Sequence, residues 1–343
     1  MSGYKNTLYV TTSGAYIGKD HETAQVSVDK EVKLSVPLHH LASIVCLGPI
    51  TVSPPLMAEC AERGIDVAFL TENGRFLARV DGIAQSGATL RRAQYRAADD
   101  IEKSLALAKS FVVGKIANAR TTLLRSAREQ EDPAAVQPLE KAASSMENRL
   151  PGALAAKTHD EVRGQEGEAA ATYFGAFNQM IRQQRETFQF EGRNRRPPAD
   201  PANAMLSFFY ALLLNDASAA LSAVGLDPAI GYLHADRSGR PSLALDLCEE
   251  FRPFLADRTA LALINLQQVK VEGFVKRDTG GVEMSASTRK AVITAYQARK
   301  QEAITHPFTE QETTVGLLVH IQARLLARAI RGDLDAYPPF HCR

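Results

Sequence analysis

Residues 231–256 read GYLHADRSGRPSLALDLCEEFRPFLA and contain the clearest change of local structure in the chain. His234 is followed by a turn-rich segment, Asp236 to Pro241, whose glycine and proline cannot continue a helix. A helical pattern opens at Ser242, because the apolar residues after it recur at the i, i+3, i+4, i+7 spacing of one helix face. These residues are Ala244, Leu247, Cys248, Phe251, Phe254 and Leu255. The stretch therefore predicts a loop that carries a histidine, followed by an amphipathic helix.

Three carboxylates share one face of this predicted helix. Asp246, Glu249 and Glu250 follow the helical spacing, and the loop that carries His234 can fold back over them. An imidazole nitrogen beside clustered carboxylate oxygens is a donor set that Mg²⁺ or Mn²⁺ accepts, and the imidazole favours Mn²⁺. Acidic helix faces are more often solvated surface, however, and a single histidine is more often structural. Both readings stay open on these residues alone.

A further candidate carboxylate lies upstream. The pattern predicts a helix from about His159 to Phe188, in which Glu166 continues the apolar stripe that runs to Phe177. Glu168 lies on the polar side of the same helix. A carboxylate directed inward is costly unless it is protonated, paired or bound to a metal. The sequence thus selects Glu166 as a candidate ligand, with a buried ion pair to an arginine as the alternative.

Two pieces of the sequence, in this order and separation, resemble a known signature. They are RGQEG at 163–167, which runs into a helix bearing Tyr173 and Phe174, and HADRSGRPSLALDLCEEFRP at 234–253. Together they resemble the CRISPR-associated integrase and endonuclease family of spacer acquisition, in a subtype I-like form. The match extends more loosely over essentially the whole chain.

The resemblance implies a catalytic site and a metal. One divalent ion, Mg²⁺ or Mn²⁺, would be held by Glu166, His234 and Glu249. Asp246 resembles a further acidic position of the motif, either as a partner that orients His234 or as a ligand itself. Many family members carry aspartate in the third ligand place, so Glu249 is one methylene longer than in those proteins.

The resemblance also implies a reaction and partners. The family inserts short DNA fragments, the spacers, into the CRISPR array when a DNA 3′-hydroxyl attacks a phosphodiester in the repeat. With water as the nucleophile the same site would be a nuclease. The implied partners are double-stranded DNA (prespacer and CRISPR repeat), a second copy of the chain in a homodimer, and a small CRISPR-associated adaptor protein.

The arginines near these ligands are candidate DNA contacts. Arg163, Arg237, Arg240 and Arg252 flank the predicted ligands and could contact phosphates, although structural ion pairs are equally consistent with the sequence. Two other functions compete with the integrase reading. One is a general metal-dependent phosphodiesterase acting on small phosphoesters, which would need a closed pocket. The other is a DNA-bridging scaffold without catalysis, in which the acidic cluster is structural.

Composition limits the class of protein. The 343 residues are 45% hydrophobic and 23% charged, which is typical of a soluble globular protein, and the length favours two domains. A net charge of +1 does not by itself indicate DNA binding, so that reading depends on local clusters. Four scattered cysteines fit a reducing cytosol. The start of the chain shows no signal-peptide pattern, and the apolar run Met205 to Leu214 is too short to span a bilayer, so we expect a cytoplasmic protein without membrane contact.

The expected fold class is α+β with two domains. Residues 1–85 are predicted to form a small β domain, with strands at 6–12, 15–18, 24–28, 33–37, 42–47 and 66–70, one helix from Pro54 to Gly64, and a turn at Asn73-Gly74. The resemblance implies that this domain mediates dimerisation.

Residues 86–343 are predicted to form a larger helical catalytic domain. It should contain one long helix from Arg91 to Arg128, a short helix within 129–158, an apolar helix from Asn203 to Val224 and a helix from Ser287 to Gln301. The expected β-hairpin insertion spans Val269 to Met284, with its turn at 278–281. A capping box at Thr309 and Glu312 predicts the start of the last helix.

Overall fold

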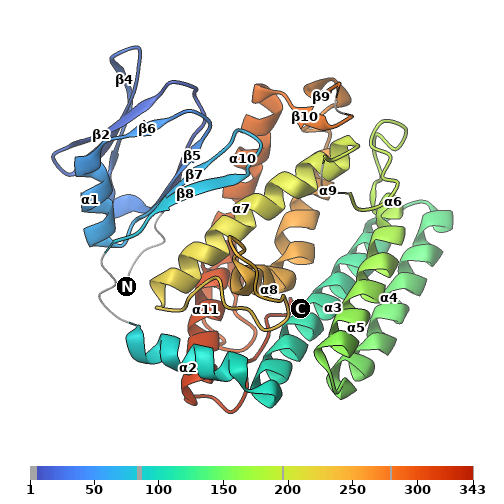
Figure 1. Cartoon of the computed structure of the whole chain (residues 1–343). Coiled ribbons are helices and arrows are strands. Elements are labelled where there is room, and N and C mark those ends of the chain that lie inside the picture. Colours follow the sequence, from blue (N-terminus) through green and yellow to red (C-terminus); the bar gives the residue numbers. More distant parts are fainter. Residues whose placement is uncertain (1–5, 83–86, 195–196, 279, 343) are drawn as a thin grey trace. The chain divides into compact units, whose positions relative to one another are not determined.

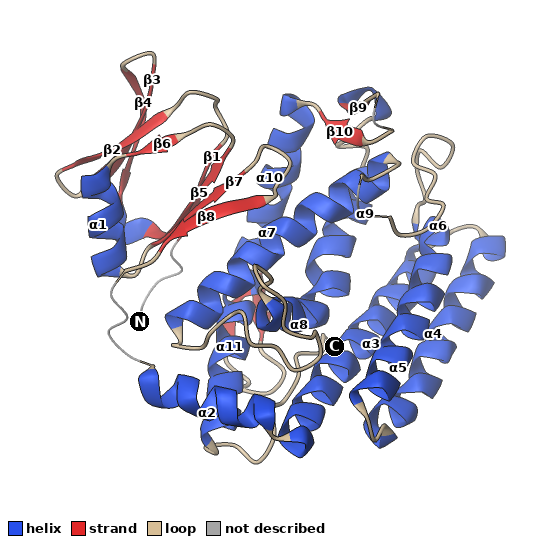
Figure 2. Cartoon of the chain, viewed as in Figure 1, coloured by secondary structure: helices blue, strands red, loops and turns tan. Residues whose placement is uncertain are grey.

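The computed structural model describes residues 6–82, 87–194, 197–278 and 280–342. The chain divides into two compact units, Met1–Ser86 and Gly87–Arg343. Strands dominate the first unit and helices the second, as Figure 1 and Figure 2 show. The predicted α+β class, with a β-rich N-terminal part and a helical C-terminal part, is confirmed.

Two four-stranded sheets build the N-terminal unit. One has the order β1-β5-β7-β8, with parallel pairs except for the antiparallel β7–β8 hairpin, and the other has the order β4-β3-β2-β6. The strands are β1 Asn6–Val10, β2 Tyr16–Asp20, β3 Thr23–Val28, β4 Glu31–Pro37, β5 Leu41–Leu47, β6 Thr51–Val52, β7 Asp66–Leu70 and β8 Phe76–Val80. A core that includes Ile17, Ile44 and Val67 lies between the sheets and helix α1.

Local sequence signals set the limits of helix α1, Pro54–Arg63. The Ser53 hydroxyl accepts a hydrogen bond from the Leu56 amide, and Pro54 occupies the first turn, where a missing N–H costs nothing. Gly64 ends the helix in the left-handed conformation, with φ of 67°. The predicted bounds of this helix are confirmed.

The helical unit contains ten helices and two short hairpins within its described residues. The helices are α2 Ala88–Asp99, α3 Ile101–Glu129, α4 Pro133–Ala155, α5 His159–Gly175, α6 Phe177–Met180, α7 Pro201–Ala223, α8 Ser242–Phe251, α9 Arg258–Asn265, α10 Ala286–Gln301 and α11 Val315–Arg331. The hairpins pair β9 Phe274–Lys276 with β10 Val282–Met284, and β11 Ala303–Thr305 with β12 Glu312–Thr314. Helices α3, α4 and α5 lie side by side, and α3 also packs on α8 (Figure 1).

Helix α7 is the apolar centre of this unit. By length and composition alone, this helix could cross a membrane. The shorter run Met205 to Leu214, considered in the sequence, did not indicate this. Of its most apolar 18-residue stretch, 67% is buried inside the protein. It packs against α8 and α11, so its apolar character is accounted for by the core.

Several predicted helix boundaries were wrong. The single helix predicted over 91–128 is two helices, because Asp100 interrupts it and its carboxylate caps α3 by accepting from the amides of Glu102 and Lys103. Ile101, the first residue of α3, is 74% exposed at this break. The segment 129–158 holds a full helix of 23 residues rather than a short one. The helix predicted to reach Phe188 ends at Gly175, followed by the four-residue α6.

The C-terminal part also differs from expectation. The predicted insertion hairpin is present as β9 and β10, although Thr279 in its turn lies outside the described residues. The capping box at Thr309 and Glu312 was wrong, because Glu312 begins a second hairpin strand and α11 starts only at Val315. The backbone of 312–314 pairs with 303–305, and these ladder hydrogen bonds replace the expected helical turn.

Candidate active site

Two helices and one loop bring the predicted site residues together. Helix α5 carries Glu166, helix α8 carries Asp246 and Glu249, and the loop before α8 carries His234. Glu166 is 27% exposed, whereas the side chains of Asp246 and Glu249 are buried. Glu168, two residues after Glu166, is 64% exposed and pairs with Arg149 on the outer side of the helix. The predicted difference between the two glutamates is therefore observed.

Asp246 holds the loop that presents the histidine. Its Oδ2 accepts from the backbone amides of Tyr232 at 2.7 Å and Leu233 at 3.0 Å. Its Oδ1 accepts from the His234 amide at 3.0 Å and lies 2.6 Å from His234 Nδ1. Both oxygens are thus fully engaged within the protein. A carboxylate at Nδ1 fixes the tautomer in which Nδ1 bears the proton, and this leaves Nε2 with a free lone pair.

A lysine lies between the two glutamates. Lys115, from the middle of α3, forms ion pairs with Glu166 Oε1 and with Glu249 Oε2, the latter at 2.6 Å. Arg252 pairs with the other oxygen of Glu249. Burial alone raises the pKa of Glu249, but the charges of Arg252 and Lys115 outweigh it and hold the pKa at about 2. Burial alone lowers the pKa of Lys115, and the charges of Glu249 and Glu166 raise it above its ordinary value. Glu249 and Lys115 are therefore both charged at neutral pH.

The donor set fits a divalent cation. His234 Nε2 lies 3.9 Å from Glu249 Oε1, which is within an ångström of the separation of about 3 Å that two ligands of one octahedral ion adopt. Glu249 Oε2 receives no hydrogen bond of good geometry, despite its ion pair with Lys115. Among the described residues no three His, Cys, Asp or Glu side chains converge closely enough to hold an ion, and here the Lys115 ammonium lies where the two glutamates meet. The glutamates thus already accommodate a cation between them.

Glu250 does not belong to this cluster. It was expected to share a face with Asp246 and Glu249, but its Oε1 accepts from the Tyr337 hydroxyl and its Oε2 from the Phe340 amide and Gln322 Nε2. Burial raises the pKa of Glu250 to about 8, and these three donors oppose the rise. The residue anchors the C-terminal segment to the back of α8.

The four candidate arginines lie in different environments. Arg237 and Arg240 are on the loop between His234 and α8, where Arg237 is exposed and Arg240 is partly covered. Arg163 pairs with Asp160 and donates to the Leu233 carbonyl at 3.3 Å. Arg252 is buried, pairs with Glu249 and stacks 4.9 Å from the centre of the Tyr210 ring. Only the two loop arginines are therefore free of a described partner near the candidate site.

Sequence reasoning missed Lys115 and Asp257. Lys115 lies on the face of α3 that includes the buried Val112, Ala119 and Thr122, so a charged residue at this spacing was a signal of a buried carboxylate partner. Asp257 is buried and accepts from the Tyr210 hydroxyl at 2.8 Å, and burial raises its pKa to about 6. It lies in a π-helical segment, Arg252–Asp257, that no sequence pattern indicated.

Solved structures of CRISPR-associated proteins and casposases share this fold. A casposase bound to its integration product superposes with a TM-score of 0.83 at 20% identity, over 98% of this chain and 94% of that one. A chain of a Cas6-RT-Cas1–Cas2 complex superposes with a TM-score of 0.81 at 26% identity, over 99% of this chain, which spans 36% of that longer one. This chain therefore shares its fold with a chain of a Cas1–Cas2 complex and with a casposase.

The sequence relationships are closer and define the family. The model of the family "CRISPR associated protein Cas1" matches residues 8–298. A CRISPR-associated endonuclease Cas1 of Chlorobaculum tepidum is 48% identical over 340 residues, which cover 99% of both chains. The protein belongs to the Cas1 family, and the resemblance found in its sequence is confirmed.

Proposed function

We propose that this protein is a metal-dependent DNA endonuclease and integrase of CRISPR adaptation. The observation that carries the proposal is that Glu166 and Glu249 meet at the Lys115 ammonium, while His234 Nε2 lies 3.9 Å from the other oxygen of Glu249 and Asp246 fixes the histidine. The relative at 48% identity is named as an endonuclease, and a casposase with the same fold was solved with its integration product.

We assign Glu166, His234 and Glu249 as ligands of a Mg²⁺ or Mn²⁺ ion. Bound there, the ion would supply Lewis-acid activation of the scissile phosphate and of the attacking hydroxyl. Asp246 is a positioning residue, since both of its oxygens are used by the loop and the imidazole. These contacts favour orientation over ligation for Asp246, the two roles that the sequence left open.

The chain's own cations have two separate tasks in this proposal. Lys115 and Arg252 neutralise the buried glutamates, and Arg252 is too deeply buried to reach DNA. The loop arginines Arg237 and Arg240 remain candidate phosphate contacts, and Arg163 supports the loop through the Leu233 carbonyl. A rigid site beside a basic loop suits an approaching phosphodiester backbone.

A small hollow beside Glu166 favours DNA over a small phosphoester. The hollow that Lys115, Glu166 and Arg252 line has a volume of about 50 Å³ and does not include His234 or Glu249 in its lining. Pockets that enclose small ligands usually measure about 300–1,000 Å³. This hollow is too small to enclose a phosphoester, which favours a substrate that lies across the site from outside, as a duplex or strand does.

We also propose the partners that the family resemblance implies. A chain with the same fold belongs to a Cas6-RT-Cas1–Cas2 complex, which supports an adaptor of the Cas2 kind. The proposed setting is the cytoplasm. For the homodimer, the N-terminal unit offers edge strand β4, on which Val32 and Leu34 are exposed apolar side chains, and edge strand β8 with exposed Phe76 and Leu77. Apolar edge strands are natural sites for pairing with a second copy.

The test is strand transfer of a labelled short duplex with free 3′-hydroxyl ends into a supercoiled plasmid that contains the repeat. The reaction is run with the cognate adaptor, with Mn²⁺, Mg²⁺ or chelator, and with the variants His234→Ala and Glu166→Gln. Glu168→Gln on the exposed side of α5 is the matched control. We expect joining that needs metal, is lost in both site variants and persists in the control.

The other outcomes separate the parts of the proposal. Metal-dependent cleavage without joining, lost with His234, would leave a nuclease and refute the integrase assignment. Joining that survives both site variants would show that these residues are not the active site.

A further inference from the structure

A buried glutamine of helix α2 contacts the loop that carries His234. Gln94 lies on the buried face of α2, together with Leu90 and Ala97 at helical spacing, and its side chain is fully covered. A polar side chain in such a place is costly unless it is hydrogen-bonded. The partners of Gln94 therefore indicate its role.

The Gln94 amide forms three hydrogen bonds, all with the backbone of the loop. Its Oε1 accepts from the Asp227 amide at 2.8 Å. Its Nε2 donates to the Asp227 carbonyl at 2.8 Å and to the Ile230 carbonyl at 3.2 Å, so both of its hydrogens are used. Because the chain forms no helix or strand here, these three backbone groups depend on the side chain for their partners.

Two further contacts join α2 to the same part of the loop. The Tyr95 hydroxyl donates to Asp227 Oδ2 at 3.0 Å. Just before the helix, a Cβ on Gly87 would lie 2.9 Å from the Gly225 carbonyl oxygen, so the two backbones are in close contact. Helix α2 therefore holds the first part of the loop, residues 225–230.

Only Gly231 separates this first part from the residues that Asp246 holds. The last loop residue bonded to Gln94 precedes Gly231, and Tyr232, which follows it, donates its amide to Asp246. A Cβ on Gly231 would lie 2.7 Å from the His234 carbonyl oxygen, so the chain is tightly packed at this point. The buried Tyr232 also reaches both sides, since its hydroxyl donates to the Gln94 carbonyl at 3.4 Å. A shift of the first part of the loop would therefore pass to His234.

We infer that Gln94 is a positioning residue of the candidate metal site, which acts on His234 through the loop and touches neither metal nor DNA. Asp246 fixes the imidazole and the backbone beside it, whereas Gln94 fixes the chain that leads to them. The role of Gln94 towards a metal rests on the proposed function. Its hold on the loop rests on the contacts alone.

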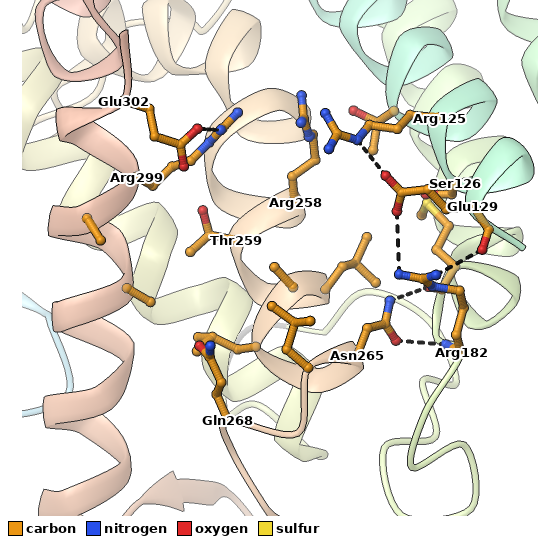
Figure 3. Close-up of a pocket in the computed structure, with 18 residues that line it drawn as sticks. Arg125, Ser126, Glu129, Arg182, Arg258, Thr259, Asn265, Gln268, Arg299 and Glu302 are labelled. Carbon is orange, nitrogen blue, oxygen red and sulfur yellow. Dashed lines mark hydrogen bonds and ion pairs between the residues drawn. The ribbon is translucent and has the colours of Figure 1, made fainter.

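The substitution Gln94→Met tests this role with a side chain of similar size that forms none of the three hydrogen bonds. The matched control is Asn265→Leu, because Asn265 holds another loop in the same way. Its Oδ1 accepts from the Arg182 amide at 2.7 Å, and its Nδ2 donates to the Met180 carbonyl at 3.0 Å. Figure 3 shows Asn265 and Arg182 in a hollow whose lining includes none of the predicted metal ligands.

Two measurements separate the hold on the loop from its effect on the site. Hydrogen exchange of the 225–236 peptide is followed in chelator, and the Kd for Mn²⁺ is measured by calorimetric titration. In Gln94→Met, exchange in this peptide should become about ten-fold faster or more. Mn²⁺ should bind about ten-fold more weakly, as is usual when a residue that orients a ligand is lost. Asn265→Leu should leave both quantities unchanged.

The opposite results would overturn the inference. Unchanged exchange in Gln94→Met would show that Gln94 does not hold the loop. Faster exchange with unchanged Mn²⁺ affinity would show that His234 keeps its place without Gln94. Equal weakening of Mn²⁺ binding by the control would indicate a general loss of stability instead of positioning. If the wild type binds no Mn²⁺, the proposed function falls, and hydrogen exchange still decides whether Gln94 holds the loop.

A second variant serves if Gln94→Met does not fold. Gln94→Glu keeps an acceptor for the Asp227 amide, and its protonated form can donate to one carbonyl, whereas its carboxylate form cannot. The ratio of its Mn²⁺ Kd to that of the wild type should therefore exceed one and rise with pH from 6 to 8. A ratio near one throughout, with wild-type exchange of the loop, would overturn the inference.

Discussion

The substitution Asp246→Asn tests whether hydrogen bonds to one carboxylate hold the histidine loop in place. The change is nearly isosteric, but it converts one acceptor oxygen into an NH₂ donor. Each oxygen of Asp246 faces two N–H groups: Oδ2 those of Tyr232 and Leu233, and Oδ1 those of the His234 backbone and ring. Whichever way the amide turns, two buried donors lose their acceptor.

The expected loss of stability follows from that count. A buried polar group left without its partner costs about 1–3 kcal/mol, so two of them should cost about 2–6 kcal/mol. A typical domain is stable by only about 5–15 kcal/mol, so the loss should be plainly measurable. It should be concentrated in the loop, and the backbone amides of 232–234 should therefore lose much of their protection against hydrogen exchange.

Urea unfolding in chelator, together with hydrogen exchange of the 231–236 peptide, measures both effects without involving a metal. Asp236→Asn is the matched control, because Asp236 is exposed and its Oδ1 accepts one bond, from the Gly231 amide at 3.1 Å, which an amide oxygen can keep. The control should change stability by less than about 0.5 kcal/mol. If Asp246→Asn costs less than about 1 kcal/mol and leaves exchange unchanged, Asp246 does not hold the loop, and its oxygens are available as metal ligands.

Three further predictions address other contacts of the site. Lys115→Met should raise the affinity for Mn²⁺ by about ten-fold or more in calorimetric titration, because the ion no longer competes with an ammonium, and should cost about 3 kcal/mol of stability in chelator. A lower affinity would instead show that Lys115 orients the ligands. The pKa of Glu250 is raised in the folded state from 4.5 to about 8, so the folded protein holds an extra proton between these values. Its stability therefore falls as pH rises through them, by up to about 5 kcal/mol. Glu250→Gln should flatten this dependence in urea titrations from pH 5 to 8, and an unchanged slope would contradict the assignment. Gly231→Ala places a methyl group 2.7 Å from the His234 carbonyl oxygen and from Ser242 Cβ. It should therefore destabilise the loop by about 1–3 kcal/mol and weaken Mn²⁺ binding. Unchanged Mn²⁺ affinity would show that the loop accommodates the added methyl group without moving His234.

The sequence predicted best those features that depend on neighbouring residues. Ser53, Pro54 and Gly64 predict where helix α1 begins and ends, and all three occupy the predicted capping and first-turn positions in the structure. Periodicity also separated Glu166 from Glu168 correctly, because both lie in one regular helix whose buried side is set by a few large side chains. In both cases the local signal and the tertiary environment agree.

Features that depend on distant partners could not be predicted in this way. The spacing of Asp246, Glu249 and Glu250 placed all three on one face, yet Glu250 turns to the Tyr337 hydroxyl and the Phe340 amide, which lie 87 and 90 residues later in the chain. Likewise, the buried spacing of Lys115 indicates a carboxylate partner but not which one, because its two glutamate partners come from the distant helices α5 and α8. Asp100 was read as part of a helix, because only its side-chain geometry shows that it ends one helix and caps the next.

The bonds of Glu250 to the C-terminal segment bear on when the enzyme becomes active during its synthesis. Glu250 precedes its partners by up to 90 residues, and until residue 340 has left the ribosome its carboxylate must stay in water. Helix α8 therefore cannot settle into its final position early, although the neighbouring Glu249 and Asp246 belong to the candidate active site. We expect the nascent chain to remain inactive towards DNA until residues 337–340 have been made, so that translation itself would delay the proposed activity.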